Sequence, residues 1–265
     1  MRRRPVSLCA LVAAATASLS ACGVLYPEVE DDRLVVMVPL NPDWAEHRVV
    51  IWPVYEAAEP PQATVNMYRG DAHSGSVSWT LVATATEPGE CNGYISLRPS
   101  NHVSLCLDPG APLDPGAAYM VEVMAEGYRT ARGHTLAVGD FDVETAVLTR
   151  TGASARLDAS WTGSVAAHRY FVSLRKRRPP YNKDPKAWYA EVDDTSVTMM
   201  VPDSALDNPV VPLILDVAAV SKEHHAYLTS GTGGSRFSVP PVQNIENGFG
   251  FVGSMRVRSL LVSTK

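Results

Sequence analysis

The sequence predicts an all-β protein with two β-sandwich domains. Short runs of alternating apolar and polar residues fill the chain after about residue 33. Prolines and glycines interrupt these runs about every ten residues, which is typical of the turns in a sandwich. No stretch carries the sustained apolar spacing i, i+3, i+4, i+7 of an amphipathic helix. The chain is therefore expected to bury its core between sheets.

The first sandwich is expected over residues 33–144. Its candidate strands are 33–39, 48–55, 63–68, 77–83, 93–97, 103–107, 118–125 and 132–138. Tyr119, Val121 and Val123 alternate along one of these strands and could share one face, after a turn that ends at Gly116.

The second sandwich is expected over residues 145–239, where the pattern resembles a fibronectin type III module. Ala155, Leu157, Ala159 and Trp161 alternate toward one face. The tryptophan is large enough to fill the gap between two sheets, so it is expected in the core. Further strands are expected at 168–177 and 195–202. Residues 212–231 are expected to form the final hairpin, with its turn at 221–225.

The last segment, residues 240–265, contains glycines at the spacing G-x-G-x-x-G: Gly248, Gly250 and Gly253. A dinucleotide site needs a helix that opens on such glycines and an acidic residue about twenty positions later. Here β-like residues follow, and 12 residues remain after Gly253. The glycines are instead expected to permit a tight turn and close backbone approach. Phe249 and Phe251 are expected to point inward and anchor this segment; an exposed aromatic patch is the alternative.

Residues 1–21 are typical of an export signal, because three arginines precede about a dozen apolar residues, too few to span a bilayer as a helix. The end of this segment and the next residue, Leu-Ser-Ala-Cys, resemble the lipobox of bacterial lipoproteins, in which the cysteine thiol receives diacylglycerol. Cys22 is therefore the predicted lipidation site, and residues 22–32 are the predicted tether. Since Gly23 follows rather than an aspartate, we expect a lipid anchor in the bacterial outer membrane, on the periplasmic side or at the cell surface.

The charge of the exported chain argues against a nucleic-acid partner. Residues 1–21 hold three arginines and no acidic residue, so their loss leaves 20 basic and 28 acidic side chains, a net charge of −8. Nucleic-acid binding depends on basic surface that neutralises phosphates. The expected contact with a membrane is made through the N-terminal lipid.

The predicted export also gives each of the four cysteines an expected role. Cys9 leaves with the signal, and Cys22 receives the lipid. Cys91 and Cys106 flank a predicted hairpin, so they are expected to form a disulfide in an oxidising compartment. A bridge that closes about 15 residues stabilises a fold by roughly 3 kcal/mol in the chain-entropy model.

No pattern in the sequence indicates a catalytic residue, a metal site or a cofactor. No serine lies in a G-x-S-x-G context, and Asp193 and Asp194 are expected to cap a turn. His224 and His225 are adjacent, and adjacent side chains on a hairpin point to opposite sides. We therefore expect an exposed turn there rather than a metal site.

A cluster of basic and aromatic residues within 174–189 stands out in this acidic chain. Arginine, tyrosine and tryptophan make efficient contact surfaces. The candidate contact surface consists of Arg175, Lys176, Arg177, Arg178, Tyr181, Lys183, Lys186 and Trp188. A solvated loop with a packed Trp188 is the alternative.

The tail and the two predicted sandwiches together resemble an uncharacterised family of bacterial envelope lipoproteins. The C-terminal motif of that family is Asn-Ile-x-x-Gly-Tyr/Phe-Gly-x-Phe-Gly. Asn244, Ile245, Gly248, Phe249, Gly250 and Gly253 fit the motif, and Val252 departs from it. The resemblance implies a surface or periplasmic lipoprotein, often encoded near TonB-dependent outer-membrane transporters. No functional residue can be transferred from the family.

Together these features predict a membrane-anchored envelope lipoprotein that is not an enzyme and acts as a binding or accessory module. The expected partner is an outer-membrane transporter or another envelope protein. Two alternatives stay open. One is a hydrolase or carbohydrate-binding protein with a site between the domains, where a glycosidase would need two carboxylates about 5 to 10 Å apart. The other is a structural scaffold of the envelope.

Overall fold

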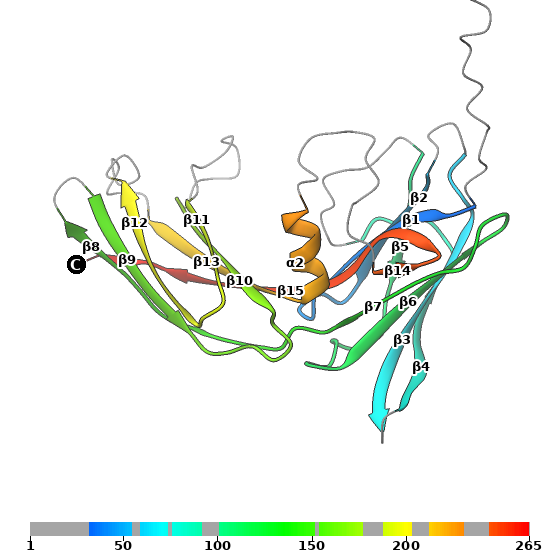
Figure 1. The fold of residues 1–265 in the computed structure, drawn as a ribbon, viewed down its shortest axis with the longest axis horizontal. Coiled ribbons are helices and arrows are strands. Elements are labelled where there is room, and N and C mark those ends of the chain that lie inside the picture. The colour runs from blue at the N-terminus through cyan, green and yellow to red at the C-terminus, as the bar shows by residue number, and fades with distance from the viewer. Residues whose placement is uncertain are drawn as a thin grey trace, which may run out of the picture. The chain divides into compact units, whose positions relative to one another are not determined.

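The structure is a computed structural model that describes residues 32–54, 59–73, 76–91, 101–151, 154–176, 188–202, 212–230 and 244–264 (Figure 1). Within these ranges the regular secondary structure consists of β-strands and one helix, α2 (Lys222–Thr229), which confirms the all-β prediction. This helix has eight residues, and no helix in the described part of the chain is long and apolar enough to cross a bilayer.

The strands form three sheets. In chain order they are β1 (Leu34–Leu40), β2 (His47–Pro53), β3 (Ala63–His73), β4 (Ser76–Ala85), β5 (Val103–Leu107), β6 (Ala118–Ala125), β7 (Ala131–Leu136), β8 (Val143–Thr151), β9 (Ser154–Trp161), β10 (Arg169–Lys176), β11 (Trp188–Val192), β12 (Ser196–Pro202), β13 (Leu213–Val220), β14 (Ile245–Glu246), β15 (Gly248–Leu261) and β16 (Ser263–Thr264). The sheet orders are β11-β10-β13-β15-β1-β2-β5, β14-β7-β6-β3-β4 and β12-β9-β8-β16. Strands β5 and β6 have the predicted bounds. The predicted strand 93–97 lies outside the described residues, and β11 was not predicted.

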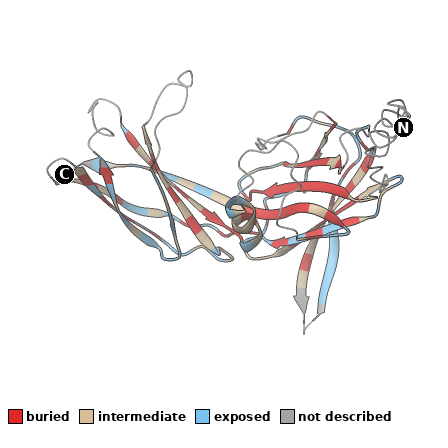
Figure 2. Cartoon of the chain, turned by 45° about the horizontal axis from the view of Figure 1, so that its top comes forward, coloured by how far each residue is buried: buried red, intermediate tan, exposed pale blue. Residues whose placement is uncertain are grey.

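The first core lies between β1, β2 and β5 of the seven-stranded sheet and β3, β6 and β7 of the five-stranded sheet. Ile51 on β2 and Met67 on β3 both belong to this core and are fully buried. Tyr119, Val121 and Val123 are also buried, so the alternation read from the sequence does place one face of β6 inward. Figure 2 shows the buried residues, in red, along these strands.

The second core lies between β9 of the four-stranded sheet and β10 and β13 of the seven-stranded sheet. Trp161 is 2% exposed, and its ring centroid lies 5.4 Å from that of Tyr170. Leu157, Val172 and Leu215 complete the centre of this cluster. Trp161 therefore fills the space between two sheets, as its size and position predict.

Strand β15 belongs to both sandwiches. Its residues 248–254 pair in parallel with the whole of β1. Its residues 255–261 pair antiparallel with β13. The C-terminal segment therefore runs through the middle of the seven-stranded sheet, with β1 on one side and β13 on the other.

The turn in the C-terminal segment lies at Asn247, before the glycines. Asn247 has a φ of 55°, a left-handed conformation that asparagine tolerates better than most residues, and it separates β14 from β15. Asn244 holds the return strand with its side chain: its Oδ1 accepts from the backbone N of Val252 at 2.9 Å, and its Nδ2 donates to the carbonyl O of Val252 at 2.7 Å. The amide side chain of Asn244 therefore replaces one backbone pair of a sheet.

The three glycines permit close approach rather than a turn, so the expected tight turn at the glycines is wrong. All three glycines lie within strand β15, and each of them pairs with a residue of β1. An added Cβ at Gly250, where φ is 104°, would overlap the carbonyl of Val36, and at Gly253 it would lie 2.8 Å from the backbone N of His224. Gly248 would bring its Cβ within 3.0 Å of the Leu34 carbonyl oxygen. The prediction of close approach is confirmed.

The two phenylalanines of the tail lie in different surroundings. Phe251 is 2% exposed and stacks on Tyr227 of α2, with 4.1 Å between ring centroids. The inward prediction is therefore confirmed for Phe251. Phe249 is half-buried, and the guanidinium of Arg33 lies 4.2 Å above its ring.

Helix α2 replaces the predicted hairpin turn at 221–225. Ser221 is its N-cap, and the hydroxyl oxygen accepts from the backbone N of His224. Glu223 lies in the first turn, where a negative charge favours a helix. The helix contacts β15 over Gly253, so His224 is 5% exposed rather than part of an exposed turn.

Polar contacts surround the point where β15 changes partners. Ser254 is fully buried; its hydroxyl accepts from the backbone N of Val138 at 3.0 Å, and its own N donates to the hydroxyl of Ser221 at 3.0 Å. The hydroxyl of Thr135 donates to the carboxylate of Glu223 at 2.8 Å and lies within hydrogen-bond distance, 3.0 Å, of the hydroxyl of Ser221. Each of these buried groups therefore has a partner.

Two buried histidines are uncharged in the fold. Burial lowers the pKa of His47 to about 4, although the charge of Asp108 acts in the opposite direction. Burial also lowers the pKa of His224 to about 4. Neither ring nitrogen of His47 has a hydrogen-bond partner among the described residues, and the same is true of Nδ1 of His224. Protonation of either ring would place an unpaired charge in the interior.

We expect Gly250→Ala to destabilise the protein by at least about 3 kcal/mol, because the new Cβ would meet the Val36 carbonyl at a left-handed φ. Gly127→Ala is the matched control: its φ is 81°, but no atom lies within 4 Å of the added Cβ, so a loss of about 1 kcal/mol is expected. Urea denaturation followed by tryptophan fluorescence measures both. Equal losses would contradict the role of Gly250.

We expect the free energy of unfolding to fall as the pH is lowered from about 6.5 to about 4. Over this range the unfolded chain binds protons at His47 and His224 that the folded chain does not bind, because the folded pKa values lie near 4. The loss at pH 4.5 is about 2 to 3 kcal/mol per histidine. Denaturation at pH 7 and pH 4.5 measures this loss in the free energy of unfolding. In His224→Met the loss should be smaller by the contribution of His224. An unchanged difference in His224→Met would refute this assignment.

Candidate functional site

The five-stranded sheet exposes its side opposite the first core, which we call the outer sheet face. It is formed by Asn66, Tyr68, Val77, Trp79, Leu81, Met120, Glu122, Arg132, His134 and Leu136. The strand register places Trp79 beside Gly70 and Leu136 beside Ala118, so one row crosses four strands. In Figure 2 the exposed residues of β4 are pale blue.

Large apolar side chains on this face are exposed to solvent. Val77 is 48% exposed, Trp79 37%, Leu81 52% and Leu136 47%. Gly70 permits this arrangement: a Cβ there would lie 2.8 Å from Cζ3 of Trp79 and 2.9 Å from Cγ1 of Val77. The tryptophan ring can therefore lie against the sheet, where it presents a flat apolar surface.

A β-bulge turns these residues outward. On β4 the apolar residues Val77, Trp79, Leu81 and Ala83 alternate without interruption, so a regular strand would place all of them on one face. The register with β3 shifts between Met67 and Tyr68, so that Met67 faces Ala83 and Tyr68 faces Leu81. One residue of β4 has no partner at this shift, and the face reverses across it. Ala83 is therefore in the core, whereas Leu81 is exposed.

Polar groups border the apolar part of the outer sheet face. Glu122 is 8% exposed; its Oε2 accepts from Nε of Arg132 at 2.6 Å, and its Oε1 accepts from the hydroxyl of Tyr68 at 3.2 Å. Thr84 donates to Oδ1 of Asn66 at 2.8 Å. Burial, followed by the charge of Glu122, raises the pKa of Tyr68, so the phenol keeps its proton. These groups fix one another and offer hydrogen bonds to a ligand rather than a free acid or base.

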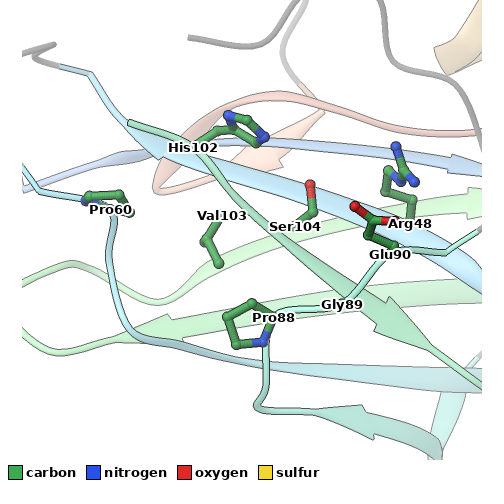
Figure 3. A pocket seen from close by; sticks show the side chains of 8 residues that line it. All are labelled: Arg48, Pro60, Pro88, Gly89, Glu90, His102, Val103 and Ser104. Carbon is green, nitrogen blue, oxygen red and sulfur yellow. The ribbon is translucent and has the colours of Figure 1, made fainter. Parts of the chain in front are cut away.

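A pocket lies beside the disulfide, with a volume of about 770 Å³ (Figure 3). Its lining residues are Arg48, Pro60, Pro88, Gly89, Glu90, His102, Val103 and Ser104. Arg48 donates to the carbonyl of Cys91, which fixes one wall to the disulfide. Among the described residues of the lining, Glu90 is the one carboxylate. Together with Arg48, His102 and Ser104 it offers polar contacts to a small ligand.

The predicted disulfide is confirmed. Cys91 and Cys106 are bonded, with their Cα atoms 5.6 Å apart. The bridge links the end of the segment after β4 to β5 and lies next to Gly89, whose N donates to the Ser104 carbonyl at 3.0 Å. The predicted lipidation site, Cys22, lies outside the described residues.

The structure brings little of the predicted basic contact surface into view. Arg177, Arg178, Tyr181, Lys183 and Lys186 lie outside the described residues. Lys176 ends β10, and Trp188 begins β11 opposite Leu174. Arg175 forms two hydrogen bonds with Asp216, which raise the pKa of its guanidinium, and it is therefore part of an ion pair of the sheet.

Sequence reasoning missed the outer sheet face. Its signal was a strand, Ser76–Ala85, that carries a tryptophan and no charged residue. The face could not be read from alternation, because the bulge reverses it. No group of three or more histidine, cysteine, aspartate or glutamate side chains in the described ranges is placed to hold a metal ion.

Comparison with known proteins leaves the family open. No family model matches the chain, and no curated protein matches it. Among solved structures, the chain is similar to the crystal structure of the calcium-binding domain CBD12 of CALX1.1, at 9% sequence identity and a TM-score of 0.21. That alignment covers 88% of this chain and 100% of the other. A TM-score this low supports no argument about the site, and the resemblance to envelope lipoproteins stays a prediction.

Proposed function

We propose that this chain is a lipid-anchored, non-catalytic binding module of the bacterial cell envelope that presents its outer sheet face to a partner. The exposure of the apolar residues on that face, 37% to 52%, carries the proposal. Apolar side chains that gather on one face beside hydrogen-bonded polar groups are typical of interaction sites.

The cysteines support the proposed location in the cell envelope. Cys91 and Cys106 form a disulfide, and such bonds persist in oxidising compartments such as the periplasm. The lipobox-like sequence at Cys22 supports a lipid anchor. Several acyl chains would hold the protein firmly, since each buried methylene contributes about 0.8 kcal/mol.

The partner that we propose is an envelope protein, and more specifically an outer-membrane transporter, as the resemblance of the tail motif implies. Trp79, Tyr68 and Arg132 belong to the residue types that contribute most to protein interfaces. They lie on the same sheet face, within four neighbouring strands. A flat apolar centre with a polar border suits a protein surface.

A glycan is the second candidate ligand for the same face. The hydroxyl of Tyr68 accepts from the amide of Asn66 at 3.4 Å and donates to the carboxylate of Glu122 at 3.2 Å, and Trp79 lies on the same face, opposite Gly70. Sugar rings have an apolar side that packs on aromatic rings, and their hydroxyls bond to amides and carboxylates. The specific observation is this adjacency of aromatic and acceptor groups.

We expect Cys22→Ala to move the protein from the membrane fraction to the soluble fraction of cells, because the thiol that receives the lipid would be gone. Quantitative immunoblotting of the two fractions measures the change. Cys9→Ala is the matched control, since that residue lies within the export signal, and it should leave the protein in the membrane. Retention of Cys22→Ala in the membrane fraction would refute the anchor.

We expect a photo-crosslinking amino acid at Leu136 to capture an envelope protein in intact cells, because Leu136 is 47% exposed on the outer sheet face. Met200, on β12 of the four-stranded sheet and 58% exposed, is the matched control position and should capture little. Mass spectrometry identifies the adducts. A transporter among them supports the finer proposal, adducts that carry sugar support the glycan, and identical adducts at both positions would count against this face.

A further inference from the structure

Strand β4 is an edge strand that no other strand of the described residues covers. It is the last strand of the five-stranded sheet, and no described strand lies beyond it (Figure 1). The sequence of β4, SVSWTLVATA, contains no charged residue and no proline. Edge strands of native sheets usually carry a charge, a proline or a cover, because bare backbone groups pair with any available strand.

Two other sheet edges of the described chain, β5 and β11, do have such protection. Strand β5 is joined to the preceding segment by the disulfide at Cys106 and by a bridge between Pro88 and Leu105. Strand β11 has five residues and carries Glu191, which lies 2.7 Å from Nε2 of His225. Strand β4 has ten residues, so its lack of protection requires an explanation.

The exposed residues of β4 are self-complementary. Consider β4 paired antiparallel with β4 of a second copy, with Trp79 at the centre of the pairing. Val77 of one copy then faces Leu81 of the other, and the two Trp79 residues face each other. These three residues are all on the outer sheet face and all exposed. On the opposite side Ser78 faces Thr80, so hydroxyl meets hydroxyl. No charge lies opposite a like charge in this register.

We propose that β4 pairs with β4 of a second copy of this chain, antiparallel and centred on Trp79. The pairing satisfies the backbone groups of the edge and brings Val77, Trp79 and Leu81 of the two copies side by side on one face. It joins two five-stranded sheets into one and makes their outer sheet faces continuous across a two-fold axis. This inference goes beyond the proposed function and does not rest on it, since it needs neither the lipid nor the partner.

A second copy explains the strand better than a foreign segment does. A foreign strand would have to match the apolar pattern on one side and the hydroxyls on the other. The same strand, reversed, matches both at once because its pattern is symmetric about Trp79. Isologous contacts of this kind are the commonest way in which soluble proteins form dimers.

The test uses introduced cysteines in the full-length chain in its native membranes. The native Cys91 and Cys106 are bonded to each other, so a new thiol is free to react. In the proposed register the Cα atoms of position 77 and position 81 of the other copy lie about 5 Å apart, within the range of a disulfide. Two copies of position 77 lie about 14 Å apart, beyond that range.

We expect co-expressed Val77→Cys and Leu81→Cys chains to form a disulfide-linked dimer on a non-reducing gel, while each variant alone forms none. Val77→Cys with Leu228→Cys is the matched control, because Leu228 is 47% exposed but lies on α2. No dimer from the co-expressed pair, or equal dimer from either variant alone, would overturn the proposal. An adduct of Val77→Cys with another protein, in place of the dimer, would also overturn it and indicate a foreign strand.

A second variant distinguishes a dimer linked through β4 pairing from one linked by chance collision of the introduced thiols. Trp79→Lys, added to both partners of the cysteine pair, would place two like charges opposite each other on the axis, so the linked dimer should be lost. Trp79→Phe should retain it. Formation of the Cys91–Cys106 bond reports that each variant still folds. Persistence of the dimer in Trp79→Lys would contradict the register.

Discussion

The structure depends on the pairing of one strand, β15, with two partners. Its first half is parallel to β1 and its second half antiparallel to β13, so the same 14 residues complete the sheets over both cores. The partners come from opposite ends of the described chain, and the loop that closes between β1 and β15 is long. The entropy of such closure grows only with the logarithm of loop length, so the backbone hydrogen bonds and burial of β15 can outweigh it.

Where β15 changes partners, polar groups determine its position. Ser254 and Ser221 exchange backbone and side-chain hydrogen bonds, and both residues are buried. A shift of β15 by one residue would leave these groups unpaired, at about 1 to 3 kcal/mol each. Burial opposes the ionisation of Asp43, but hydrogen bonds from Arg258 and Arg256 outweigh it and lower its pKa. The carboxylate therefore holds the second half of β15 as a charge.

Local signals in the sequence predicted local structure. Alternation placed β5 and β6, and the size of Trp161 placed it in the second core, because both depend on residues close in the chain. The partners of β15 could not be predicted, since strand pairing over two hundred residues leaves no periodic trace. Helix α2 begins with a Ser221 cap, but the sequence pattern predicts a turn there, because eight residues are too few to show helical periodicity.

The functional features likewise divide into one that the local sequence predicts and one that it does not. The Cys91–Cys106 bond was predictable because the two cysteines are only 15 residues apart in the sequence. The outer sheet face was not, because its apolar residues continue the core pattern of β4 without a break. One unpaired residue at the bulge decides that Ala83 packs inward and Leu81 outward. A period of two cannot reveal such an insertion.

The five-stranded sheet is held at one edge and free at the other. At the first edge β14 and β7 are tied to β15 through Asn244, whose side chain bonds the Val252 backbone and the His134 carbonyl. At the other edge, β4 is exposed from Val77 to Leu81, before the bulge, and reaches the core only after it, at Ala83 and Ala85. Contacts made there add to the sheet without disturbing the packing around β15, because Trp79 rests on Gly70 and not on the core. A binding surface can therefore be kept apolar at this edge while the opposite edge maintains the fold.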